Sequence, residues 1–141
     1  MEQALYQASI VTFEELGFMF PSACADASNI ADAESVGVAI DFSGEFGGRF
    51  LLRIERDVLP LIAANMLGEE PPFDAVMLKD VLGEIANVIC GNMLPAIGGK
   101  AAVFHLGAPH VIEKFDAAEK PSAIARLDLE DGRADVSLYL N

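Results

Sequence analysis

Four residues in the segment 78–94 (LKDVLGEIANVICGNML) combine reactive side chains with helical spacing. Asp80, Glu84, Asn87 and Gly91 stand at i, i+4, i+7 and i+11, which places them along one side of a helix. An asparagine amide donates and accepts hydrogen bonds, so it can orient a water molecule, although it is too weak a base to deprotonate one. A glutamate one turn away offers an anchor for a partner's lysine or arginine. The pair therefore suits hydrolysis of a phosphoryl group, where much of the catalysis is placement and charge stabilisation.

The same stripe is also typical of a solvated helix face, because apolar residues cover the opposite side. Helix propensity argues against that simpler interpretation. Asparagine is weaker than Glu, Lys or Gln by several tenths of a kcal/mol, and an internal glycine costs roughly 1 kcal/mol. Gly83, Asn87, Gly91 and Asn92 thus weaken a helix that could be stronger, and such local inconsistency is expected where function or close packing intervenes.

Other reactive motifs are absent from the sequence. It contains no G-x-x-x-x-G-K-S/T phosphate loop and no G-x-S-x-G elbow. His105 and His110 lie close together, but zinc would need more ligands at suitable spacing, so we expect no metal site. Cys24 and Cys90 are too few for a disulfide scaffold, and we expect reduced, buried thiols.

The stripe lies on the longest expected helix, residues 74–97. Apolar periodicity predicts a first helix over 4–20. Asp57 is expected to cap a second helix that runs to about residue 67, with Gly68 as its C-cap. Along the chain, the expected strands lie between the first and second helices and after the longest helix.

Alternating and β-branched segments predict strands over 36–42, 49–55, 101–106, 111–115, 123–129 and 134–140. The first two and the last two form hairpins. A helix followed by a hairpin therefore occurs twice, which suggests a structural half-repeat. The elements predict an α+β fold, a mostly antiparallel sheet packed with one long helix and shorter helices.

Length and charge narrow the class of protein. The 141 residues fit one domain spanning 1–141. With 22 acidic and 9 basic residues, the net charge of −13 disfavours nucleic acid and anionic membrane as partners. Charge or glycine interrupts the apolar runs before 18 residues, so we expect no membrane insertion. The start Met1-Glu2-Gln3 lacks the basic residues of a secretion signal, so we expect a cytoplasmic protein.

The segment DVLGEIANVICGN, which holds Asp80, Glu84 and Asn87, resembles the signature helix of the CheC/CheX family. These chemotaxis phosphatases dephosphorylate the receiver protein CheY. The preceding NMLGEE (65–70) resembles the approach to that helix, and the likeness is clearest over about 45–95. The resemblance implies that Glu84 anchors a lysine of the receiver, that Asn87 orients the attacking water beside the acyl phosphate, and that Asp80 supports them. It implies no cofactor of the chain's own, since Mg²⁺ would belong to the receiver.

One departure from the CheC pattern points to the CheX type. CheC-like members often carry a second E-x-x-N on the first helix, whereas here Gly17 follows Glu14 and Phe18 follows Glu15 at that spacing. The chain therefore resembles the single-site CheX type. This resemblance implies a homodimer in which the sheets of the two subunits join. The apolar strand 136–140 is either such an edge or an internal strand.

Three functions stay open on the sequence. The first is a phosphatase for the aspartyl phosphate of a CheY-like response-regulator receiver. The second is a non-catalytic receiver-binding or adaptor domain on the same fold, since fold does not guarantee activity. The third is a structural dimer whose polar stripe is only solvated.

Overall fold

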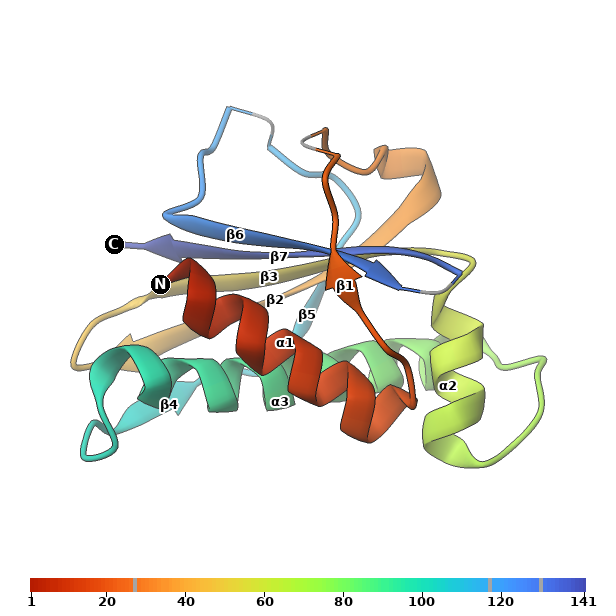
Figure 1. Cartoon of the computed structure of the whole chain (residues 1–141), viewed down its shortest axis with the longest axis horizontal. Helices are drawn as coiled ribbons and strands as arrows, with labels where there is room; N and C mark the ends of the chain where they lie inside the picture. Colours follow the sequence, from red (N-terminus) through yellow and green to blue (C-terminus); the bar gives the residue numbers. More distant parts are fainter. Residues whose placement is uncertain (27, 117, 130) are drawn as a thin grey trace.

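The computed structural model describes residues 1–26, 28–116, 118–129 and 131–141. Helices α1 (Glu2–Gly17) and α3 (Ala75–Gly98) lie on one face of a seven-stranded sheet, with α2 (Leu59–Leu67) at one end of this helical layer (Figure 1). Loops and the short 3-10 helix η1 (Asp32–Glu34) cover the other face (Figure 1). The structure is thus the expected α+β fold.

All the strand pairs described are antiparallel. The strand order is β1-β6-β7-β3-β2-β4, and β5 also pairs with β2. The strands are β1 (Ser22–Ala23), β2 (Ser35–Gly44), β3 (Gly48–Glu55), β4 (Phe104–Leu106), β5 (His110–Ile112), β6 (Ala123–Leu129) and β7 (Gly132–Leu140).

The order is nearly symmetric about the centre of the sheet: from either edge, a short strand is followed by the two strands of a hairpin. Hairpins β2–β3 and β6–β7 meet where β3 pairs with β7. The short strand after α1 pairs with β6, and the short strands after α3 pair with β2, so each half supplies strands to the hairpin of the other. The half-repeat is therefore visible in the connectivity. Because β7 lies between β3 and β6, the segment 136–140 is the internal strand of the two alternatives expected for it, and not a sheet edge.

The core lies between the sheet and the two long helices. Successive side chains of a strand point to opposite faces, and on β3 the inward residues Phe50, Leu52 and Ile54 are fully buried. Val136 and Leu138 on the paired strand β7 are equally buried. Each such side chain stabilises the fold by about 1.5–3 kcal/mol, so the helices are held firmly on this face.

Helix ends differ in part from expectation. α1 ends at Gly17 because Phe18 adopts the left-handed conformation, with φ 51°. α2 begins at Leu59 and Asp57 does not cap it, whereas Gly68 is the expected C-cap with φ 66°. α3 begins after Asp74, whose carboxylate accepts a hydrogen bond of 2.8 Å from the backbone N–H three residues later.

By length and composition α3 could cross a membrane. It has 24 residues, and its most apolar window has a mean hydropathy of 1.3. The expectation that glycine and charge rule out such a segment was too strict in this respect. Half of that window is buried inside the protein, which is the behaviour of a core helix.

Candidate functional site

Helix α3 has one side buried in the core and an open side that is exposed to solvent. Its inward residues, such as Ile85 (1% exposed) and Ile89 (0%), belong to the core. Asp80 and Glu84 are exposed and Asn87 is half-buried. Because the core fixes the rotation of the helix about its axis, the glutamate and the asparagine are presented together on its open side.

The side chains of this stripe are free within the protein. Among the described residues, no hydrogen bond or ion pair involves the side chain of Asp80, Glu84 or Asn87. A carboxylate and an amide that satisfy no internal partner are available for an external one. This is the arrangement that water positioning and lysine anchoring require.

A loop packs beside the stripe. The ring of Pro109 stands 3.4 Å from the position that a Cβ on Gly83 would take, so a side chain larger than a methyl group there would collide with it. The backbone N–H of Gly107 anchors the same loop by donating to the carbonyl of Asp41 at 2.8 Å. Gly83 thus has a packing role, next in sequence to Glu84.

The far end of the stripe contains an exposed glycine and a proline. Gly91 is exposed, and a Cβ added there would meet nothing within 4 Å. Pro95 lies inside α3 four residues later. Since proline has no N–H, the carbonyl of Gly91 lacks its ordinary i+4 donor. The sequence alone could show this pairing of Gly91 and Pro95, but only the structure shows that the position is open.

The cysteines and histidines form no second site. Burial raises the pKa of the Cys90 thiol to about 12, so it stays protonated and serves as a small apolar side chain. Cys24 is only half-buried, which corrects the expectation for that thiol, and both cysteines are free. His105 and His110 are exposed. Within the described ranges, no three His, Cys, Asp or Glu side chains are grouped as a metal site.

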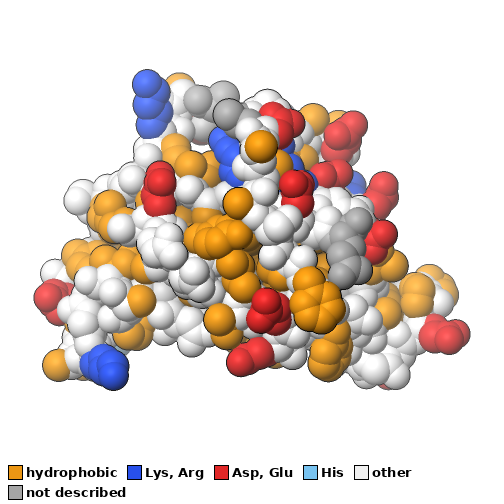
Figure 2. All heavy atoms as spheres, viewed as in Figure 1, with side chains coloured by type: hydrophobic (Ala, Val, Ile, Leu, Met, Phe, Trp, Pro, Cys, Tyr) orange, Lys and Arg blue, Asp and Glu red, His pale blue; other side chains and the backbone are white. Residues whose placement is uncertain are grey.

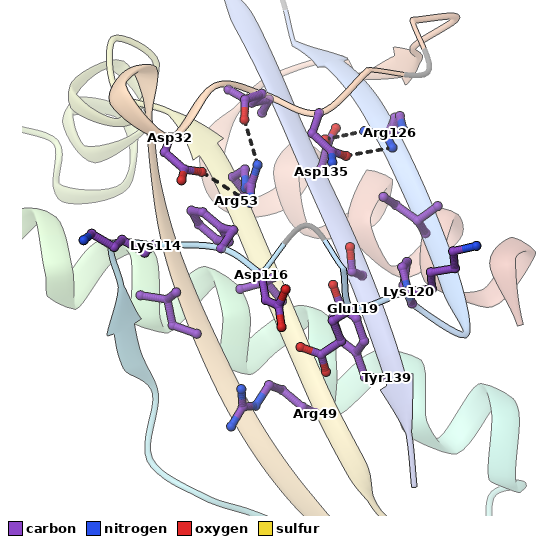
Figure 3. Close-up of a pocket in the computed structure, with 18 of the residues that line it drawn as sticks. Asp32, Arg49, Arg53, Lys114, Asp116, Glu119, Lys120, Arg126, Asp135 and Tyr139 are labelled. Atoms are coloured by element: carbon purple, nitrogen blue, oxygen red, sulfur yellow. Dashed lines mark hydrogen bonds and ion pairs between the residues drawn. The ribbon is translucent and has the colours of Figure 1, made fainter.

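A cavity lies on the other face of the sheet, away from α3. It measures about 750 Å³ and lies between the outer surfaces of the strands and a strap, residues 113–116 and 118–121 (Figure 3). Arg126 donates to the carboxylate of Asp135 at 2.8 Å, and Arg53 donates to the carbonyl of Ile30 at 2.7 Å. These two guanidinium groups already have partners within the chain, and the rest of the lining holds charges of both signs, such as Lys114 and Glu119.

On the same outer face, Arg133 of β7 holds the loop that contains Ser28 against the sheet. Arg133 donates to Asp135 at 3.0 Å and to the carbonyl of Ser28. Burial lowers the pKa of Arg133, but the hydrogen bond and charge of Asp135 outweigh burial and leave that pKa raised. This cluster has the properties of a structural ion network.

Acidic side chains outnumber basic ones on the face that carries α1, where the basic groups are sparse (Figure 2). This distribution agrees with the net charge of −13. Binding of an acidic partner would therefore depend on short-range contacts, because charges further apart than about 8 Å are largely screened at physiological salt.

Comparison with known proteins supplies the family. The model of the family "Chemotaxis phosphatase CheX" matches residues 36–128, a range that includes the whole stripe. No curated protein sequence matches the chain at the level required for significance.

Solved structures share the fold. Chemotaxis protein CheX from Desulfovibrio desulfuricans has a TM-score of 0.79 at 17% identity, over 99% of this chain and 97% of that one. CheX from Vibrio vulnificus has a TM-score of 0.79 at 16% identity, over 99% and 95%. The CheX–CheY–BeF3–Mg²⁺ complex from Borrelia burgdorferi has a TM-score of 0.71 at 19% identity, over 99% and 96%. With two thirds of its length matched by the family model and this fold, the chain belongs to the CheX family of chemotaxis phosphatases.

Proposed function

We propose that this protein hydrolyses the aspartyl phosphate of a CheY-like receiver, with Glu84 and Asn87 as the residues that enter the receiver's active site. The observation that carries the proposal is their joint presentation on the open side of α3, without internal partners in the described part of the chain. Membership of the CheX family supports the activity.

In the proposed reaction, a water molecule attacks phosphorus and the bond from phosphorus to the aspartyl oxygen breaks. The products are inorganic phosphate and the free carboxylate of the receiver. The Asn87 amide orients the water by accepting one of its hydrogen bonds, and Glu84 anchors a lysine of the receiver, which fixes the approach. Asp80, one turn before Glu84, adds negative charge beside that lysine. We assign the chain no cofactor of its own and place Mg²⁺ on the receiver.

The proposed partner has a precedent among the structural neighbours. The Borrelia burgdorferi CheX was crystallised with CheY, beryllium fluoride and Mg²⁺. A protein of the same fold therefore binds a receiver that carries a phosphoryl analogue. We propose the same class of partner for this chain.

The test is the decay of a phosphorylated CheY-like receiver, measured as phosphate release with wild type, Glu84→Ala and Asn87→Ala. We expect wild type to accelerate the decay and Asn87→Ala to lose on the order of 10²-fold of that acceleration, as loss of positioning does. Asn92→Ala, exposed on another side of α3, is the matched amide control, and Glu14→Ala, exposed on α1, is the carboxylate control. Fully active Asn87→Ala, or wild type with no effect on the decay, would refute the proposal.

A non-catalytic receiver-binding domain is the alternative. It predicts capture of the receiver by wild type with no change in its rate of dephosphorylation. The same assay, combined with a pulldown, separates the two.

We further propose a homodimer in the cytoplasm. Because β7 is internal, a dimer that joins sheets has to use the β4/β5 edge, the two-residue strand β1 or the part of β6 beyond its pairing with β1. Light scattering after gel filtration should give twice the monomer mass of 15.0 kDa.

A further inference from the structure

Gly91 differs from the other glycines of the chain. Of the twelve, Gly44, Gly68 and Gly99 have positive φ values, which a side chain would strain. Eight more have a neighbouring atom within 4 Å of the position of an added Cβ, so that side chains there are limited by packing. Gly91 has neither restriction among the described residues, since its φ is not positive and the space beside it is open.

Glycine is therefore not required at this position by the fold. Inside a helix it is less favourable than alanine by roughly 1 kcal/mol. The side-chain atoms of the Pro95 ring do not explain it either, because none of them lies within 4 Å of the missing Cβ. A side chain whose absence no contact among the described residues requires points to a partner outside the chain that approaches closely.

The carbonyl of Gly91 adds an independent observation. Pro95 removes the N–H that would bind it, and no described donor outside α3 binds it. A backbone oxygen without its helical partner is a strong acceptor. Without a Cβ beside it, this oxygen is also easier to reach, and it lies one turn beyond Asn87.

We propose that Gly91 is a contact and specificity-determining residue for the receiver. Its carbonyl accepts a hydrogen bond from an N–H of the receiver near the phosphorylation site, and its missing side chain lets the receiver's backbone lie against α3. This inference rests on the proposed function, because it takes the receiver as the partner. It extends the contact by one turn, from Glu84 and Asn87 to Gly91 and Pro95.

Three variants separate the two parts of the proposal. Gly91→Ala adds a methyl group, Gly91→Gln adds a side chain that blocks approach, and Pro95→Ala restores the N–H that occupies the Gly91 carbonyl. All three improve helix propensity, so thermal midpoints should be equal to or above wild type and misfolding would not account for lost binding. Ala96→Gln, exposed on another side of α3, is the matched control for added bulk.

The measurement is the dissociation constant for a CheY-like receiver loaded with beryllium fluoride and Mg²⁺, together with its dephosphorylation. We expect Gly91→Gln to weaken binding about tenfold or more, as overpacking does. Pro95→Ala should weaken it roughly fivefold, the effect of losing one hydrogen bond. Ala96→Gln should bind like wild type.

The outcomes distinguish this inference from the proposed function. If wild type accelerates dephosphorylation but Gly91→Gln and Pro95→Ala bind and act normally, the contact at Gly91 is wrong and the phosphatase stands. If wild type binds without accelerating the decay and the variants still bind more weakly, the contact stands and the phosphatase is wrong. A wild type that does not bind any receiver overturns both.

Discussion

The ring of Phe115 lies in the space that a side chain at Gly37 would fill, since a Cβ there would stand 2.7 Å from Cε1 of the ring. The guanidinium carbon of Arg53 lies 3.3 Å from the centre of the same ring. Gly37 is the third residue of β2. Phe115 belongs to the strap, which lies over the outer face of the sheet (Figure 3). This contact therefore fastens the strap to the sheet.

Gly37→Ala should displace the Phe115 ring and lower the free energy of unfolding by about 1–3 kcal/mol, as overpacking does. Trypsin should then cut more quickly after Lys114, which lies in the strap, whereas Lys120 precedes Pro121 and is not a trypsin site. Adding Phe115→Ala removes the collision, so the double variant should lose less than the sum of the two single changes. Strict additivity of the unfolding energies would contradict the contact. Phosphatase activity should stay at the wild-type level, because the strap lies on the face away from α3.

Asn87 and Ile89 are two residues apart on α3 but should respond oppositely to alanine. Asn87 is half-buried, and its side chain has no hydrogen-bond partner among the described residues. Asn87→Ala should therefore leave stability unchanged or raise it by several tenths of a kcal/mol. Ile89 is 0% exposed, and Ile89→Ala should cost about 2–5 kcal/mol. Urea denaturation measures both. A large loss for Asn87→Ala would mean that the amide has a structural role.

Cys90 makes stability depend on alkaline pH. Burial raises its pKa from 9.0 to about 12, so between these values the unfolded chain has lost the proton that the folded chain keeps. The stabilisation is complete below pH 9 and declines as pH rises toward 12, by about 1.4 kcal/mol at pH 10.

The comparison variant is Cys90→Ala, made in a Cys24→Ala background so that Cys90 is the only thiol that differs. The difference in unfolding free energy between the two proteins should shrink by about 1.4 kcal/mol from pH 8 to pH 10. A difference that does not change with pH would show that the thiol titrates normally in the fold.

Receiver binding should become faster as salt is added. The chain carries a net charge of −13 and the phosphorylation site of a receiver is acidic, so the two repel one another at long range. Raising ionic strength from about 0.01 M to 0.1 M shortens the screening length from about 30 Å to 10 Å, which should increase the association rate. Stopped-flow mixing with a receiver of net negative charge tests this. An association rate that falls with salt would indicate attractive steering by a local basic surface.

The elements defined by local pattern could be predicted from the sequence. Alternation predicted both long hairpins, and the spacing of Glu84 and Asn87 placed them on the open side of the longest helix, as found. The end of α1 was predicted too late, because a phenylalanine at position 18 takes the left-handed conformation that glycine usually adopts there. The two-residue strand β1 is too short for a pattern of its own.

Contacts between distant segments could not be read from the sequence. The internal place of β7 depends on which hairpin lies beside it, and the match of Gly37 with Phe115 joins positions far apart in the chain. Within the site, Gly83 and Gly91 have the same low helix propensity and cannot be told apart by it. Only the three-dimensional surroundings show that Pro109 packs beside the first and that the second faces open space.

The exchange of short strands between the two halves of the sheet has a consequence for how the chain folds. Because β1 pairs with the hairpin of the second half, and β4 and β5 with the hairpin of the first, neither half can complete its own part of the sheet. The two halves of the chain thus exchange their short strands, as the subunits of a domain-swapped dimer do. Fragments 1–70 and 71–141, expressed separately, should each be largely unfolded and should recover the fold only when mixed. The helix that carries Glu84 and Asn87 would then gain its rigid support from residues that precede it as well as from those that follow.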